Sequence, residues 1–203
     1  MGNITYTAIY ARIGTSAAAS IQICSTVMNL FMIVTFGLAN AAVVIIGNEI
    51  GANRESEAIS ASKKISSLSF KISILLAIVL AFLSKPIVSF FNVSVEVKIA
   101  SEYILYVYAF ILVFKIYNAV MIVGILRGGG DATYGSILQG LTLWLIGIPL
   151  AAFAAFIIKL PIYFVVMFAA VEEIIKVFFM MKRFKSFKWI KNMVNDEQNE
   201  VLT

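Results

Sequence analysis

Long apolar runs separated by short polar segments dominate the pattern of this chain. Between Arg12 and Glu49, 36 consecutive residues include no Lys, Arg, Asp or Glu, and the 27 residues between Asp131 and Lys159 include none either. Runs of about 18 or more such residues are typical of helices that cross a lipid bilayer. The pattern predicts an all-α integral membrane protein with five full spans, at residues 17–47, 65–84, 102–126, 133–157 and 161–181.

The first apolar run predicts one unusually long helix. About 20 helical residues cross a hydrocarbon core of ~30 Å, so this run is too long for one upright helix and too short for two helices with a loop. We expect a single tilted helix that projects beyond the bilayer. Residues 1–12 in front of it are too few to span and lack the basic segment of a signal peptide. They are expected to be the second half of a helix whose beginning is missing.

The composition excludes most classes of enzyme. The chain is 61% hydrophobic and 13% charged, which is about half the charge of a typical soluble domain. It contains no histidine, and this excludes imidazole metal sites and Ser-His or Cys-His nucleophilic pairs. The single cysteine, Cys24, lies within the first apolar run and is expected to be a buried apolar side chain without a disulfide. We expect neither an enzyme nor a resident cofactor or metal.

The distribution of Lys and Arg predicts the orientation in the bilayer. Because five spans alternate sides, nine of these residues fall on one side, four on the other and three within spans. The positive-inside rule places the side with nine, which includes the C-terminus, in the cytoplasm. We therefore expect a multi-pass membrane protein with a cytoplasmic C-terminus. The net charge of +5 follows from these loops and the tail, so no nucleic-acid partner is expected.

The C-terminal segment, residues 182–203, alternates basic with aromatic residues before a polar end. Such a segment is typical of an amphipathic anchor on the cytoplasmic face of the membrane. Trp189 and the neighbouring phenylalanines are expected at the level of the lipid headgroups.

Polar residues inside the predicted spans are the first candidates for function, because each needs a partner or water within the bilayer. Gln22, Asn29 and Asn40 lie within about 20° of one line along the first span. This stripe forms either interhelical hydrogen bonds, worth about 1 kcal/mol each, or the wall of an aqueous cavity. Gln139 is a further cavity candidate on the fourth span, which Pro149 is expected to kink.

Lys115 is the most informative of these residues. It lies 13 residues from Glu102 and 12 from Arg127, so at about 1.5 Å per residue its ammonium group cannot reach either end of the third span. A lysine at the bilayer centre costs about 2.5–3.5 kcal/mol, and a counter-charge, carbonyl groups or water must offset this cost. Tyr108 and Asn118 share its helix face. A cavity role and a structural ion pair are both consistent with this position.

The fifth predicted span carries three charged residues, Glu172, Glu173 and Lys176. Glu172 and Lys176 are i,i+4 neighbours, which favours an ion pair along their own helix. A structural pair and a role in coupling ion binding to transport are the two interpretations.

Two glycine-rich turns follow spans on the predicted cytoplasmic side, at residues 47–58 and 124–133. Neither has the GK[ST] sequence or the strand–helix context of a phosphate loop. In the second turn three glycines allow a tight reversal, and Arg127 and Asp131 are expected to bracket it electrostatically.

Taken in order, these features resemble the C-terminal half of the bacterial multidrug and toxic compound extrusion (MATE) transporters. The resemblance covers nearly the whole chain, and its most specific part is the turn from Arg127 to Asp131. The residues that carry it are Gly47, Gly51, Ala52, Arg54, Lys115, Asn118, Gly124, Arg127, Gly128, Gly129, Gly130, Asp131, Gly147, Pro149, Glu172, Glu173 and Lys176.

The resemblance implies that residues 1–181 form one transmembrane helical-bundle lobe, with five full spans and a truncated first helix, of a two-lobe transporter. It implies a secondary active antiporter that exports cationic or amphiphilic organic compounds, drugs among them, in exchange for Na⁺ or H⁺. The expected partners are the lipid bilayer and an N-terminal lobe absent from this chain.

No ion ligand follows from the resemblance, because the acidic ligands of the family lie partly on the first lobe and on helix seven. Two alternatives to the antiporter are a lipid-linked flippase of the same superfamily and a half-length lobe that is inactive without a partner lobe.

Overall fold

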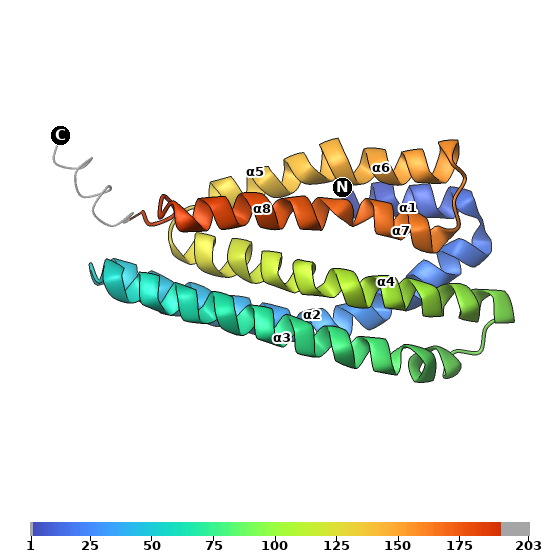
Figure 1. The fold of residues 1–203 in the computed structure, drawn as a ribbon, viewed down its shortest axis with the longest axis horizontal. Helices are drawn as coiled ribbons and strands as arrows, with labels where there is room; N and C mark the ends of the chain where they lie inside the picture. The colour runs from blue at the N-terminus through green and yellow to red at the C-terminus, as the bar shows by residue number, and fades with distance from the viewer. Residues whose placement is uncertain (1, 192–203) are drawn as a thin grey trace.

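The computed structural model describes residues 2–191, and all of its regular structure is helical. It forms an elongated bundle of six helices, several of which are divided by short π-helical segments (Figure 1). The elements are α1 (Gly2–Ile13), α2 (Thr15–Gly51), α3 (Glu55–Ser89), α4 (Val95–Ala119) with η1 (Val120–Leu126), α5 (Ala132–Thr142) with η2 (Leu143–Gly147), α6 (Ile148–Ala152) and η3 (Phe153–Ile157), and α7 (Ile162–Ala169) with α8 (Val171–Lys185).

Four of the predicted spans are confirmed as helices long and apolar enough to cross a membrane. They are α2, α3, the continuous helix 95–126, and the continuous helix 132–157. Each begins or ends beyond the predicted bounds, because polar residues extend the helices past the apolar runs. At about 1.5 Å per residue, the 37 residues of α2 reach about 55 Å, in agreement with the long helix predicted for the first run.

The fifth predicted span differs from the expectation of one full-length helix. A turn at Ala170 divides it into α7, with 8 residues, and α8, with 15 residues. Neither segment alone has the ~20 residues that a regular span requires. The turn precedes Glu172 and Glu173, so both carboxylates belong to the first turn of α8.

Gly14 separates α1 from α2. Its φ of +152° lies in a region that residues with a Cβ atom rarely adopt, and the chain changes direction there without a longer loop. This single glycine allows α1 to pack beside α6, while α2 runs along the opposite side of the bundle (Figure 1).

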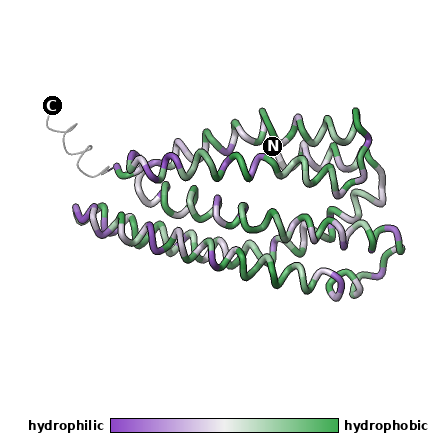
Figure 2. Tube along the Cα trace, in the orientation of Figure 1, coloured by the Kyte–Doolittle hydropathy of each residue, from purple (hydrophilic) through white to green (hydrophobic). Residues whose placement is uncertain are grey.

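The helix α4 forms the centre of the bundle and packs against α2, α3, α7 and α8. In the most apolar 18-residue stretch of the span 95–126, 67% of the residues are buried inside the bundle. The corresponding fraction is 22% in each of the other three candidate spans. Its neighbours expose many large apolar side chains, as expected for surfaces that face lipid. Figure 2 shows long hydrophobic stretches along the helices, with hydrophilic residues concentrated towards the end where α8 finishes.

Small residues allow η1 to approach α2 closely. A Cβ atom placed on Gly124 would lie 2.9 Å from the Cβ of Ala42 and 3.2 Å from the carbonyl oxygen of Ala39. A Cβ atom on Gly128 would lie 3.1 Å from the backbone of Val43. Close backbone contact through glycine and alanine is the usual way in which helices pack in a bilayer, where burial of apolar area gives no driving force.

We predict that Gly124→Ala destabilises the bundle, because the added methyl group forces η1 away from α2. Overpacking of this kind typically costs about 1–3 kcal/mol. The matched control is Gly37→Ala on α2, where nothing lies within 4 Å of the added Cβ. Thermal unfolding of the detergent-solubilised chain should show a lower midpoint for Gly124→Ala alone. Equal midpoints for both variants would mean that the close approach is not needed.

Candidate functional site

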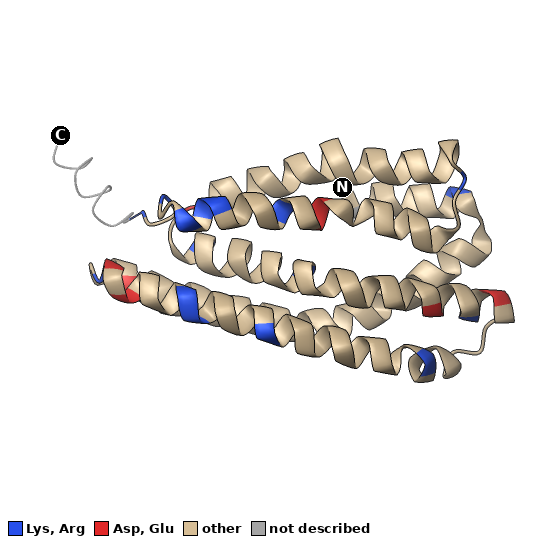
Figure 3. Ribbon diagram, in the orientation of Figure 1, with Lys and Arg blue, Asp and Glu red and all other residues tan. Residues whose placement is uncertain are grey.

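Three charged side chains lie inside the bundle at the start of α8. Glu172 is 8% exposed and Lys176 is 4% exposed, and the Glu173 side chain is 13% exposed. Figure 3 shows acidic and basic positions part-way along α8, well away from both ends of the bundle. The neighbouring helices therefore exclude Glu172 and Lys176 from solvent.

Glu173 is the centre of a buried hydrogen-bond network that joins α8 to α4. Its carboxylate pairs with Lys176 at 3.3 Å and accepts a hydrogen bond of 2.7 Å from the Asn118 side-chain amide. The same amide donates to the backbone carbonyl of Glu173 at 2.8 Å. The predicted pair was Glu172 with Lys176. The structure instead pairs Lys176 with Glu173, because Glu172 points towards α1 and η2.

Glu172 lies in a tight space formed by three elements. One carboxylate oxygen accepts a long hydrogen bond of 3.4 Å from the Tyr6 hydroxyl on α1. The other oxygen is buried and has no hydrogen-bond partner. Gly147 makes this arrangement possible, because a Cβ atom there would lie 2.9 Å from the Glu172 carboxylate and closer still to the Tyr6 hydroxyl. A buried carboxylate with an unpartnered oxygen is costly and commonly marks a functional site.

Lys115 does not converge with Asn118 as the shared helix face predicted. Asn118 is buried against Glu173, whereas Lys115 is exposed on the surface of the described chain. Lys115 makes no ion pair within 4.0 Å among residues 2–191. Tyr108, on the same face of α4, is partly buried and packs against the hydrophobic core of the bundle. The lysine therefore lies outside the buried charge network.

The polar stripe on α2 also faces away from its own bundle. Gln22, Asn29 and Asn40 are exposed, and over residues 2–191 their side chains make no hydrogen bond to another helix. Within the described residues the stripe therefore forms no interhelical hydrogen bonds, and both hydrogen bonds to helices outside this chain and a role in lining a cavity stay predictions. Gln139 is exposed as well, whereas Thr142 is buried and bonds to the carbonyls of its own helix.

The glycine-rich turn after η1 is held by a different ion pair from the predicted one. Asp131 is 2% exposed and pairs with Arg183 and with Lys191, each at 2.7 Å. Arg127 is exposed instead. In the first turn, Arg54 pairs with Glu49 at 2.8 Å, and Gly51 is exposed at the end of α2. Arg127 was expected to bracket the turn together with Asp131, but Arg183 near the end of α8 and Lys191 beyond it are the cations that pair with Asp131.

Trp189 is not the interfacial anchor that the tail pattern predicted. Its side chain is 0% exposed and its indole N–H donates to the carbonyl of Phe184 at 3.1 Å. The indole packs on Gly129, where a Cβ atom could not be accommodated, and the Lys191 N–H donates to the Gly129 carbonyl at 2.8 Å. The predicted tail begins within α8, which extends to Lys185, and its residues 192–203 lie outside the described part.

The electrostatics of Asp131 make this turn sensitive to acid. Burial alone raises the pKa of Asp131, but the hydrogen bonds and charges of Arg183 and Lys191 outweigh it and hold the pKa below its ordinary value. A pKa lower in the folded than in the unfolded chain stabilises the fold above the unfolded value, and this contribution is lost as pH falls through the folded value.

No group of three or more metal-ligating side chains (His, Cys, Asp or Glu) occurs over residues 2–191. The polar groups of the buried cluster are the carboxylates of Glu172 and Glu173, the Lys176 ammonium group, the Asn118 amide and the Tyr6 hydroxyl. Such groups can bind and release a proton or a monovalent cation. Tyr6 was missed by the sequence analysis, because nothing in the pattern of residues 1–12 distinguishes it. Gly147 was noted only among the residues that carry the family resemblance.

Comparison with known proteins identifies the family. The MatE family profile matches residues 1–153, which is well over half of the 203 residues. The chain belongs to the MatE family. The resemblance to MATE transporters seen in the sequence is thereby confirmed, and this family consists of multi-pass membrane transporters and not of enzymes. A search of functionally curated proteins gives no match.

Solved transporter structures share the fold of this MatE chain at low sequence identity. One is a MOP superfamily transporter from Pyrococcus furiosus Vc1 (DSM3638), described as having a binding pocket of reverse polarity that suggests a different function; its TM-score is 0.86. A MATE protein in complex with MaD3S also gives 0.86, and an outward-facing multidrug resistance MATE family transporter of the MOP superfamily gives 0.80. All three are 16% identical to this chain.

The share of each chain that these matches cover shows how much of the transporter fold is present. The structures align with 93–96% of this chain, but the chain spans only 42–44% of their length. It therefore corresponds to about half of the transporter fold, which is one lobe.

We predict that acid releases the segment around Trp189, because protonated Asp131 no longer pairs with Arg183 and Lys191. In a Trp144→Phe background, where Trp189 is the remaining tryptophan, its fluorescence should shift to the red as pH falls below about 4. The Asp131→Asn variant should show the shifted spectrum already at neutral pH. If both proteins have the same spectrum at every pH, the ion pairs do not hold this segment.

Proposed function

We propose that this chain is one lobe of a secondary active antiporter that exports cationic or amphiphilic organic compounds in exchange for Na⁺ or H⁺. The observation that carries the proposal is the Glu172 carboxylate, which is buried inside the bundle and has one oxygen without a hydrogen-bond partner. Membership of the MatE family supports transport as the general function. The substrate class and the coupling ion are the parts proposed here.

The network around Glu172 suits reversible cation binding. Glu173 and Lys176 form their own ion pair, so they leave Glu172 as a carboxylate without a directly paired cation. Tyr6 donates to one of its oxygens and fixes the orientation of the carboxylate. A proton, a sodium ion or the charged group of an organic cation can each satisfy the free oxygen. Because they compete for it, binding of one favours release of another.

Transport also requires a second lobe in this proposal. The chain covers less than half of the transporters that it matches, and the exposed polar side chains Gln22, Asn29 and Lys115 lie on surfaces that its own helices leave open. We propose that an N-terminal lobe completes the cavity at these side chains. A half-length chain without that lobe is then inactive. The two lobes alternate between inward- and outward-facing arrangements, as in other repeat-built secondary transporters.

The charge distribution supports the proposed orientation. Figure 3 shows Lys and Arg concentrated at the end of the bundle where α8 finishes and where α3 begins. Together with the nine-to-four distribution in the sequence, this supports a cytoplasmic location for that end, in the inner membrane of a bacterium.

One observation favours a second candidate function. Lys115 is an exposed cation in the middle of a span, and a cation in the cavity attracts anionic rather than cationic compounds. A flippase for an anionic lipid-linked molecule would use this lysine directly. In the antiporter this lysine would instead lie on the cavity wall, where its charge favours release of a bound cation.

We predict that Lys115→Met and Glu172→Gln, in a functional assembly that contains this lobe, each reduce organic-cation efflux about tenfold or more, since each removes an interaction worth at least ~1.4 kcal/mol. The measurement is efflux of a fluorescent organic cation from cells or liposomes. Lys71→Met is the matched control, because Lys71 is also an exposed lysine within a span, on α3.

Membrane insertion, measured by the yield of folded protein, should be the same for all three variants. Normal efflux by Lys115→Met would remove this lysine from the mechanism. An unmodified assembly that moves an anionic lipid-linked compound, but no organic cation, would support the flippase instead.

A further inference from the structure

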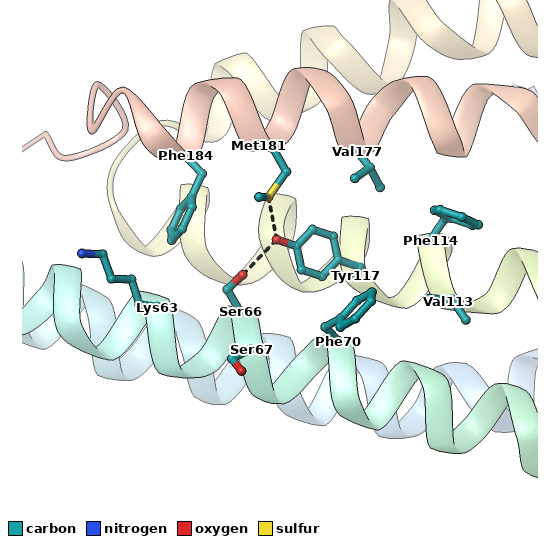
Figure 4. Close-up of a pocket in the computed structure, with 10 residues that line it drawn as sticks. All are labelled: Lys63, Ser66, Ser67, Phe70, Val113, Phe114, Tyr117, Val177, Met181 and Phe184. Carbon is teal, nitrogen blue, oxygen red and sulfur yellow. Dashed lines mark hydrogen bonds between the residues drawn. The ribbon is translucent and has the colours of Figure 1, made fainter.

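An apolar cavity of about 420 Å³ lies between α3 and α8, over the surface of α4 (Figure 4). Both helices pack on α4, and the cavity occupies the space between them. Its size and mainly apolar lining are typical of sites for small ligands. The lining residues are Lys63, Ser66, Ser67, Phe70, Val113, Phe114, Tyr117, Val177, Met181 and Phe184.

The polar groups deep in the cavity are already satisfied by one another. The hydroxyls of Ser66 and Tyr117 are 2.9 Å apart and hydrogen-bonded, and the Tyr117 hydroxyl also donates to the sulfur of Met181 at 2.9 Å. Figure 4 shows this chain of contacts crossing from α3 to α8. A polar ligand would find few free hydrogen-bond partners here, whereas a hydrocarbon chain would leave no buried polar group unpaired.

One end of the cavity carries a positive charge. Lys63 is exposed, and its ammonium group lies 5.8 Å from the centroid of the Phe187 ring. Over residues 2–191 it forms no ion pair within 4.0 Å. Figure 4 places Lys63 at one extremity of the lining and Phe114 and Val113 at the other. The cavity is therefore amphipathic along the bundle axis. Its positively charged end, at Lys63, lies towards the end of the bundle where Lys and Arg are concentrated.

Exposed apolar side chains lie at and beside the cavity. Phe70 on α3 is 49% exposed, and Phe178, next to Val177 on α8, is 69% exposed. Exposed phenylalanines are favourable only against lipid or another apolar surface. A lipid chain can enter from the side between these helices, with its headgroup at the level of Lys63.

We propose that this cavity is a binding site for an anionic phospholipid, with one acyl chain lying between α3 and α8 and the phosphate on Lys63. Basic pockets between transmembrane helices on the cytoplasmic side are suited to such headgroups. The site is separate from the Glu172 cluster, and its positive charge disfavours organic cations. The inference is therefore independent of which compound the transporter exports.

The test is photo-crosslinking of the full chain in phosphatidylcholine nanodiscs that contain phosphatidylglycerol with a diazirine on its acyl chain. Mass spectrometry should locate the cross-links on α3, α4 and α8 at the cavity residues. Lys63→Gln should lower their yield about fivefold, the effect expected for one cation near a lipid phosphate. The matched control is Lys64→Gln, which removes the same charge from an exposed neighbour that does not line the cavity.

Two further arms separate the headgroup from the acyl chain. Diazirine-bearing phosphatidylcholine should label the cavity of the unmodified chain more weakly than phosphatidylglycerol does. Ser67→Trp, at an exposed lining position, should fill the cavity and suppress labelling by both lipids. Equal yields for Lys63→Gln and Lys64→Gln, equal labelling by the two lipids, or cross-links scattered over all helices would overturn the proposal.

Discussion

A charge placed inside a bilayer has to find its partner within the protein, and the pairing of Glu173 with Lys176 and Asn118 is the interaction on which this bundle depends. It joins the central helix α4 to α8 through side chains and through the backbone carbonyl of Glu173. Because Lys176 pairs with Glu173, Glu172 contacts the Tyr6 hydroxyl instead, and one of its carboxylate oxygens has no hydrogen-bond partner. The ion pair thus fixes the helices and also creates the unpaired carboxylate on which function is proposed to rest.

The same requirement governs the end of the bundle. There Asp131 is buried between Arg183 and Lys191, and Trp189 fills the space over Gly129. These contacts attach the end of α8 to the turn between η1 and α5. Buried charges therefore hold the segment 162–191 at two places. One is the Glu173–Lys176 pair at the start of α8, and the other is Asp131 at the end of the bundle. Between these places, α8 and α3 leave the apolar cavity that we assign to a lipid chain.

The sequence predicted the spans well, because the absence of charge over a long run is a local property that hydropathy measures directly. It also identified the turn from Arg127 to Asp131 and the cluster at Glu172. The sequence did not identify contacts between residues that are far apart in the chain. Asp131 pairs with Arg183 and not with Arg127, and Trp189 packs on Gly129, which lies 60 residues earlier. No glycine or proline lies at the turn at Ala170, and the sequence therefore predicted the fifth span as one continuous helix.

Transport driven by a cation gradient is the function proposed for the assembly that contains this lobe. The most direct measurement is the flux of an organic cation through the complete assembly in liposomes, under Na⁺ or H⁺ gradients imposed in either direction. If the assembly is an antiporter, the organic cation moves against its own gradient and its direction reverses when the driving gradient is reversed. Flux that follows only the gradient of the organic cation itself, whatever ion gradient is imposed, would contradict antiport.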